Sequence, residues 1–141
     1  MLIAPENLLN HLNSRKPKYI FVDIFDTLVK RIVHPDDTKS LASTLIARGL
    51  GLPAYGELFL RLRAITERQM CLANGEVHDE LEFSFDEFPE NYLNNIRGVP
   101  PWIDKSGIDF KHLCHSMERH VEGLVLRRDD VTYDALLSYK Q

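Results

Sequence analysis

The sequence predicts a mainly helical chain of the α/β class that carries one buried β-strand. An apolar run at residues 19–25 is too short for a helix and has no helical period, so it is expected to be a strand. Apolar residues in several later segments recur at helical spacing. The only other strand-like segment is a short return at residues 124–126.

The run at 19–25 is expected to be a central strand of a sheet. Pro17 breaks the chain before it, and its apolar side chains suit a sheet that is covered on both faces. Ligands of such sheets bind beyond the carboxyl ends of the strands, where Asp23 stands. A carboxylate there is costly to desolvate without a partner, so Asp23 is a candidate functional residue. The alternative is that Asp23 and Asp26 only end the strand and cap a turn.

The segment that begins at Asp23 resembles motif I of the haloacid dehalogenase (HAD) superfamily. In that family, an aspartate after an apolar strand is the nucleophile, and a Thr-Leu pair follows four and five positions later. Thr27 and Leu28 stand at those positions here. The resemblance is to a subgroup with the pattern Phe-Asp-Ile-Phe-Asp-Thr-Leu, often a domain of larger bacterial proteins that include glycosyltransferases. Val22 replaces the first Phe of that pattern.

The resemblance implies that Asp23 is both nucleophile and Mg²⁺ ligand, with the backbone carbonyl of Phe25 as a second ligand. HAD phosphatases place an aspartate as general acid and base two residues after the nucleophile, whereas haloacid dehalogenases have an aromatic residue there, as Phe25 is here. Asp26 is one residue further along, so it is not expected to take over that role. The expected reaction is attack by Asp23 on phosphorus or carbon of a phosphorylated or halogenated small molecule.

Thr27 and Arg31 are the substrate-binding residues that the resemblance implies. In the subgroup, an Arg after the motif and a His-Pro-Asp step lead out of the core into a helical cap, and Arg31 with residues 34–36 fits that pattern. Arg31 is expected to contact an anionic substrate, and a salt bridge to a nearby acid such as Asp26 is the alternative.

The resemblance divides the chain into three parts. These are an N-terminal helix and motif I strand at 1–33, a helical cap at 34–123, and a return segment with the start of a core helix at 124–141. In the family, later strands carry a phosphoryl-binding Ser or Thr, a Lys and the acids that complete the Mg²⁺ site, and no such segments occur in this sequence. An incomplete Rossmann-like core is therefore expected.

Two functions of different class follow from this incomplete core. The first is the N-terminal portion of a Mg²⁺-dependent HAD-like hydrolase, a poor catalyst as an isolated chain because the groups that stabilise its transition state are missing. The alternative is a non-catalytic helical protein-interaction module that retains the motif I strand. In either case, the unpaired apolar edge at 19–25 is expected to promote self-association.

Helical periodicity and start signals predict helices at 38–48, 53–73, 84–96, 109–122 and 131–140. Their buried sides are expected to hold Leu41, Leu45, Ile46, Leu58, Leu62, Ile65, Tyr92, Leu93, Ile96, Leu113, Met117, Val121 and Leu124. A capping box of Ser84 and Glu87 is expected to start the third helix, and Asp129 or Asp130 to cap the last.

The sequence also predicts an N-terminal helix, a solvated helix face and a linker. An N-terminal helix should dock through Leu8, Leu9 and Leu12, whereas the charges of the 53–73 helix, Arg61, Arg63, Glu67 and Arg68, are expected on a solvated face. A linker at 98–101 and Trp102 are expected at a joint between two helices.

The histidines and cysteines do not predict a metal site. Of His112, Cys114, His115 and His120, only His112 and His115 share a helix face, and two ligands do not make a zinc site. Cys71 and Cys114 are expected to be reduced thiols of a cytosolic protein.

Length and composition place the chain among ordinary globular domains. It has 141 residues, of which 44% are hydrophobic and 27% charged. A net charge of -4 gives no general reason to expect nucleic acid or an anionic membrane as partner. No apolar run reaches transmembrane length, and Pro5 and Glu6 interrupt the apolar N-terminal stretch, so the expected location is the cytoplasm.

Overall fold

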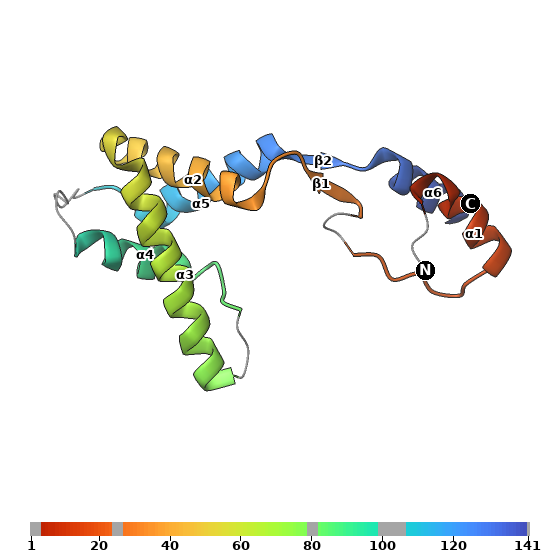
Figure 1. Cartoon of the computed structure of the whole chain (residues 1–141), viewed down its shortest axis with the longest axis horizontal. Helices are drawn as coiled ribbons and strands as arrows, with labels where there is room; N and C mark the ends of the chain where they lie inside the picture. Colours follow the sequence, from red (N-terminus) through yellow and green to blue (C-terminus); the bar gives the residue numbers. More distant parts are fainter. Residues whose placement is uncertain (1–3, 24–26, 79–81, 99–106, 141) are drawn as a thin grey trace. The chain divides into compact units, whose positions relative to one another are not determined.

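The computed structural model describes residues 4–23, 27–78, 82–98 and 107–140, and these are mainly helical, as predicted (Figure 1). The α-helices in these ranges are α1 (Leu8–Arg15), α2 (Pro35–Gly49), α3 (Gly56–His78), α4 (Phe88–Arg97), α5 (Phe110–Val125) and α6 (Asp130–Lys140). Short 3-10 turns precede α1 and α3, at Pro5–Asn7 and Pro53–Tyr55. Strands β1 (Val29–Arg31) and β2 (Leu126–Arg128) form the only sheet within the described ranges.

The chain divides into two compact units. Unit 1 comprises Met1–His34 and Val125–Gln141, and unit 2 comprises Pro35–Leu124. In the parts of the chain that the structure describes, none of the helices combines the length and the apolar composition that crossing a membrane requires.

Unit 1 is held together by a small ladder between the two ends of the chain. β1 and β2 are antiparallel, with Val29 opposite Arg128 and Arg31 opposite Leu126. Beyond the ladder, the amide of Ile32 donates to the carbonyl of Val125 at 2.9 Å. α1 packs against α6, with Leu12 buried and Leu8 and Leu9 half-buried, so the predicted N-terminal helix is confirmed.

Asp129 links this ladder to the start of α6. Its amide donates to the carbonyl of Leu28 at 2.8 Å, and its Oδ1 accepts from the amide of Thr132 at 3.2 Å, which confirms it as the predicted cap. The carboxylate also forms an ion pair with Lys30. The hydrogen bond from Lys30, followed by the one from Thr132, lowers the pKa of the Asp129 carboxyl.

The predicted central strand is wrong over residues 19–23. These residues have no regular secondary structure, and Tyr19 is 71% and Phe21 96% exposed. A central strand needs a partner on each side for its backbone donors and acceptors. The predicted return at 124–126 does not supply one, because the strand found there begins two residues later and pairs with β1. Residues 24–26, which include Phe25 and Asp26, lie outside the described ranges.

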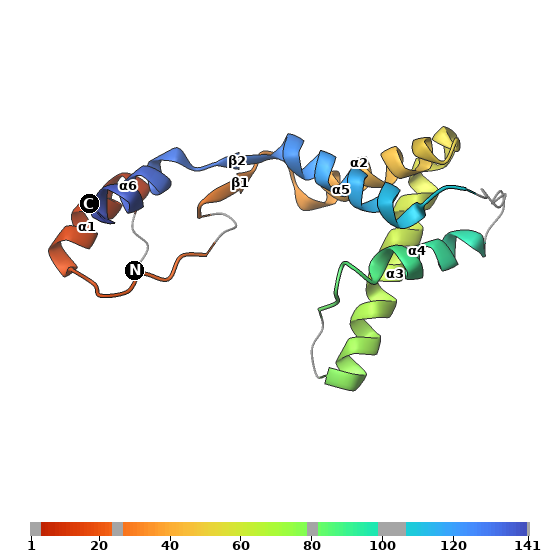
Figure 2. The same cartoon turned by 180° about the vertical axis from the view of Figure 1, so that it is seen from behind.

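Unit 2 has a core to which all four of its helices contribute. α2 packs on α3, α3 packs on α4, and α2 and α5 lie side by side in both views (Figure 2). The buried cluster consists of Ile46, Ala47, Leu50, Phe59, Leu62, Met70, Phe88, Tyr92, Ile96, Phe110 and Cys114. The Tyr92 hydroxyl, which is buried among these side chains, donates to the carbonyl of Phe59 at 2.7 Å.

Several helix boundaries in unit 2 differ from the predicted ones, and the end of α3 and the start of α4 differ by four residues or more. α3 continues through Gly75 to His78, because a glycine within a helix costs only about 1 kcal/mol relative to alanine and does not have to end it. α4 begins at Phe88, and the predicted capping box is absent. Ser84 instead forms a turn, in which its Oγ accepts from the amide of Asp86 at 3.3 Å. Residues 99–106, with most of the predicted linker and Trp102, lie outside the described ranges.

The helix faces that unit 2 buries also differ in part from the predicted ones. Leu41, Ile65 and Leu124 were expected to be buried and are 39%, 48% and 48% exposed. α2 instead buries small side chains such as Ala42, Ser43 and Ala47, which lets neighbouring helices approach closely. An added Cβ at Gly49 would lie 2.8 Å from Leu113 of α5. The contact face of α2 is therefore set by side-chain size as well as by hydrophobicity.

Candidate functional site

The residues that the resemblance implies for catalysis lie on one short segment of unit 1. Asp23 is exposed, at the end of the irregular stretch that the structure describes. Thr27 is half-buried in the turn before β1, and Arg31 is half-buried within β1. Phe25 lies outside the described ranges. The segment is thus built around a turn and a two-stranded ladder, and not around the end of a central strand.

Three or more possible metal ligands do not come together among the described residues. Mg²⁺ requires near-octahedral oxygen coordination, typically from one or two carboxylates, waters and substrate oxygens. Over residues 4–23, 27–78, 82–98 and 107–140, no group of three or more His, Cys, Asp or Glu side chains could hold a metal ion. Asp23 as a metal ligand therefore stays a prediction.

Unit 2 contains a buried ion cluster that the sequence interpretation missed. Arg63 was expected on a solvated face, yet it is only 5% exposed. Its Nε donates to Glu67 Oε1 at 2.8 Å, and its Nη1 pairs with Glu118 of α5. Lys39 of α2 reaches the other oxygen of Glu67, with 2.6 Å between Nζ and Oε2. The cluster therefore ties α2, α3 and α5 together.

The electrostatics of this cluster keep Arg63 charged. Burial, the largest single influence, acts to lower the pKa of Arg63, but Glu118 and then Glu67 outweigh it, so the pKa is raised. Its guanidinium also lies 5.4 Å from the ring centre of Phe88. The sequence signal for this cluster was the spacing of Arg63 and Glu67. A pair of opposite charges four residues apart can lie on a buried or on a solvated helix face, so this spacing does not distinguish the two.

The thiol and histidines of α5 have separate surroundings. Burial raises the pKa of the Cys114 thiol to about 12, so this thiol is an inert core group. His115 Nε2 lies 3.8 Å from Asp86 Oδ1, and the His115 ring meets Phe85 edge-on at 5.5 Å. His112 faces solvent, with its Nε2 3.4 Å from Ser116 Oγ. Both histidines line an open pocket of about 360 Å³. The other residues that line it are Asp86, Asp109, Lys111, Ser116 and Arg119.

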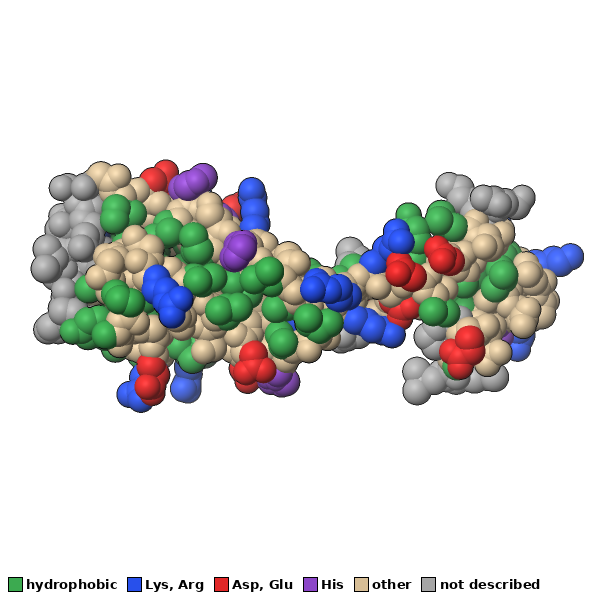
Figure 3. Space-filling view, turned by 90° about the horizontal axis from the view of Figure 1, so that it is seen from above, with side chains coloured by type: hydrophobic (Ala, Val, Ile, Leu, Met, Phe, Trp, Pro, Cys, Tyr) green, Lys and Arg blue, Asp and Glu red, His purple; other side chains and the backbone are tan. Residues whose placement is uncertain are grey.

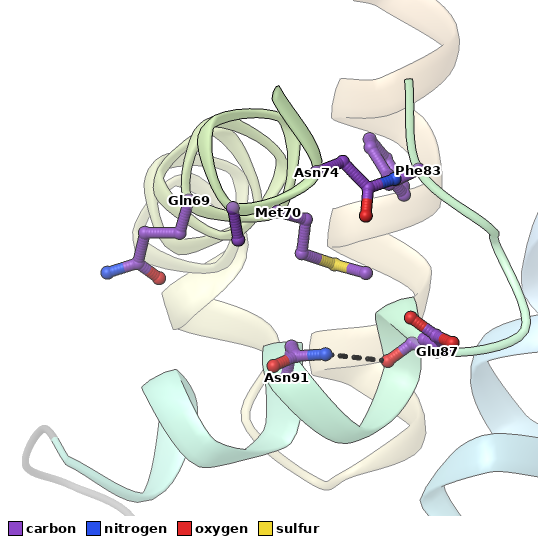
Figure 4. Close-up of a pocket in the computed structure, with 7 residues that line it drawn as sticks. Gln69, Met70, Asn74, Phe83, Glu87 and Asn91 are labelled. Carbon is purple, nitrogen blue, oxygen red and sulfur yellow. Dashed lines mark hydrogen bonds between the residues drawn. The ribbon is translucent and has the colours of Figure 1, made fainter. Parts of the chain in front are cut away.

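A second pocket of about 360 Å³ lies between α3, α4 and the segment that precedes α4 (Figure 4). Its lining residues are Gln69, Met70, Ala73, Asn74, Phe83, Glu87 and Asn91. Met70 is buried and forms the apolar floor, and Phe83 is held by stacking on Phe88 at 6.0 Å between ring centres. No sequence motif pointed to this pocket, because amide and apolar residues on a helix carry no distinctive spacing.

Internal hydrogen bonds hold the amide side chains around this pocket. Asn74 Nδ2 donates to the carbonyl of Glu82, and Asn91 Nδ2 donates to the carbonyl of Glu87 at 3.1 Å. Asn95 Nδ2 donates to Gln69 Oε1 at 2.9 Å. The orientation of each amide group is therefore determined by a neighbour.

On the face of unit 2 that Figure 3 shows, acidic and basic side chains are scattered singly among hydrophobic ones, so this face presents no patch of one charge sign.

Comparison of the chain with protein family models, with curated proteins and with solved structures found no match in any of the three.

Proposed function

We propose that the chain is the N-terminal portion of a HAD-like hydrolase, phosphatase-like or dehalogenase-like, with Asp23 as the nucleophile and unit 2 as the helical cap. The path of the chain is the observation that carries this proposal. The chain leaves unit 1 after His34, directly beyond the segment that resembles motif I, forms the helical unit 2, and re-enters unit 1 at Val125. A helical body inserted at that point is what the resemblance implies for a cap.

The pairing of β1 with β2 supports this reading of the chain path. β1 lies shortly before the exit from unit 1, and β2 lies directly after the return (Figure 1). Their antiparallel ladder holds the two connections of unit 2 side by side. Domains whose chain ends lie close together are the ones that tolerate insertion into another fold.

In the proposed reaction, a carboxylate oxygen of Asp23 attacks phosphorus or carbon, and the leaving group departs with the bonding electron pair. The product is an acyl phosphate or an ester on Asp23, which water then hydrolyses. Asp23 is exposed, so a substrate can reach it. Thr27 and Arg31 are proposed to bind the anionic part of the substrate. The family resemblance is the sole support for the Mg²⁺ dependence in this proposal.

The natural gene product is expected to be longer than the present chain and to hydrolyse a phosphorylated or halogenated substrate with Mg²⁺. Asp23→Asn should lower its kcat by at least about 10³-fold, because the covalent intermediate can no longer form. Asp37→Asn, which changes an exposed acid in the first turn of α2, should leave kcat unchanged. Steady-state kinetics and the intact mass of the gene product test this.

Two results would contradict this proposal. Activity of the longer gene product that Asp23→Asn leaves intact would exclude Asp23 as the nucleophile. Hydrolysis of an aryl phosphate by the 141-residue chain alone, abolished by Asp23→Asn, would show that the core is already complete in these residues.

A non-catalytic interaction module is the second candidate, and the exposure of Tyr19 and Phe21 favours it. The isolated chain is expected to form dimers or larger species at micromolar concentration, because exposed apolar side chains that are close together on a segment promote association. Phe21→Ser should return it to a monomer. The matched control is Val77→Ser on α3, where a side chain that is 73% exposed in unit 2 is changed, and it should not alter the mass. Size exclusion with light scattering decides, and a monomeric starting chain would refute the idea.

A further inference from the structure

We propose that the pocket between α3 and α4 binds a small organic cation, of the class of short primary amines and diamines. This inference goes beyond the proposed hydrolase and does not depend on it. It is argued from the hydrogen-bonding groups, the charges and the apolar floor of the pocket.

The pocket presents acceptor groups. The amide nitrogens of Asn74 and Asn91 each donate one hydrogen bond to a backbone carbonyl, which leaves the Oδ1 of each side chain to accept from a ligand. Each of these amides, and that of Gln69, also keeps an N–H donor. The carboxylate of Glu87 only accepts. Among the described residues, no hydrogen bond or ion pair occupies these side-chain oxygens. A ligand that satisfies them must bring donors.

Charge selects among donor-rich ligands. The described residues that line the pocket include the carboxylate of Glu87 and no Lys, Arg or His. A phosphate or carboxylate ligand would meet the Glu87 carboxylate without a compensating cation among these residues, so the charge of the lining favours a cation over an anion. An ammonium group supplies three donors and a positive charge, and its hydrogen bonds to a carboxylate are the strong, charge-assisted kind.

The floor suits the alkyl part of such a ligand. Figure 4 shows the amide of Asn74 and the carboxylate of Glu87 turned toward the space over the Met70 side chain, with Phe83 beside it. A thioether and an aromatic ring are polarisable groups that accept both methylene groups and a neighbouring cation. The volume of about 360 Å³ lies in the range of small-molecule sites.

Titration of the full chain with 1,4-diaminobutane, followed by amide NMR shifts, tests the proposal. Shifts are expected at Ala73, Phe83 and Glu87, with a dissociation constant of about 1 mM or lower. Glu87→Gln should weaken binding about tenfold or more, because it removes the charge while keeping the shape. Glu90→Gln changes an exposed acid in the first turn of α4, three residues after Glu87 and outside the pocket, and should shift the constant less than about twofold.

Matched probes and a second variant make the outcome decisive. The neutral 1,4-butanediol and the dianion succinate have the same chain length and should bind at least about tenfold more weakly than the diamine. Asn74→Ala leaves α4 untouched and should also weaken the diamine. Equal binding of the diol or succinate, unchanged binding by Glu87→Gln and Asn74→Ala, or no shifts with the diamine would overturn the proposal.

Discussion

Replacing Arg63 by alanine is expected to lower the free energy of unfolding of the chain by about 3–5 kcal/mol. Arg63 is 5% exposed, and the two carboxylates that it pairs with, Glu67 and Glu118, are themselves 17% and 14% exposed at the side chain. Removing the cation leaves Glu118 without its Arg63 partner in a poorly hydrated site and leaves Glu67 with Lys39. Among the described residues, Lys39 pairs with Glu67 and not with Glu118, so it does not neutralise both.

Urea unfolding followed by circular dichroism measures this effect. Arg61→Ala is the matched control, because Arg61 lies on the same helix in an exposed pair with Glu57 and should change stability by less than about 0.5 kcal/mol. A triple variant, Arg63→Met with Glu67→Gln and Glu118→Gln, should recover most of the loss, because it removes the charges together. A loss below about 1 kcal/mol for Arg63→Ala would mean that water reaches the cluster in solution.

Phe88→Ala is the second change with a large expected effect, a loss of about 3–5 kcal/mol in the free energy of unfolding. Phe88 has no exposed surface. Its ring stacks on Phe85 at 5.1 Å and meets Tyr92 at the same separation of ring centres. Truncation therefore removes the ring contacts with the segment before α4 and with the next turn of α4, and it leaves a cavity that these rings fill only in part.

Two comparisons isolate the cavity in this second experiment. Phe88→Leu should cost clearly less than Phe88→Ala, because it leaves a smaller void. Leu72→Ala on α3, at a side chain that is 55% exposed, should fall within about 0.5 kcal/mol of the starting chain. Similar losses for all three variants would show that side-chain packing around Phe88 is not what stabilises unit 2.

Most of the helices could be located from the sequence because their signals are local. Apolar spacing of three and four residues indicated the helices now seen at α2 to α6. The sequence offered Asp129 or Asp130 as the cap of the last of them, and the structure shows that Asp129 is the cap. The boundaries were less certain where two local signals competed. At Gly75 the cost of one glycine is small against the packing of a long helix, so the helix continued.

The candidate sites also differ in whether local sequence signals can reveal them. Asp23, Thr27 and Arg31 could be named because a motif places them within nine positions of each other. The pocket over Met70 could not, because its walls come from two helices and the segment between them, and none of its residue types is distinctive alone. Only the packing of α3 on α4 brings Asn74 and Glu87 to one opening.

The sequence by itself determined that this chain is mainly helical, where most of its helices lie and which short segment carries the resemblance to a catalytic motif. The tertiary structure alone decided that residues 19–23 are irregular, that β1 pairs with β2, and that Arg63 is buried. Helix formation depends on contacts within a few residues, which a sequence displays directly. Strand pairing and the burial of a charge depend on partners far along the chain, such as Glu118 for Arg63, and these become neighbours only when the chain folds.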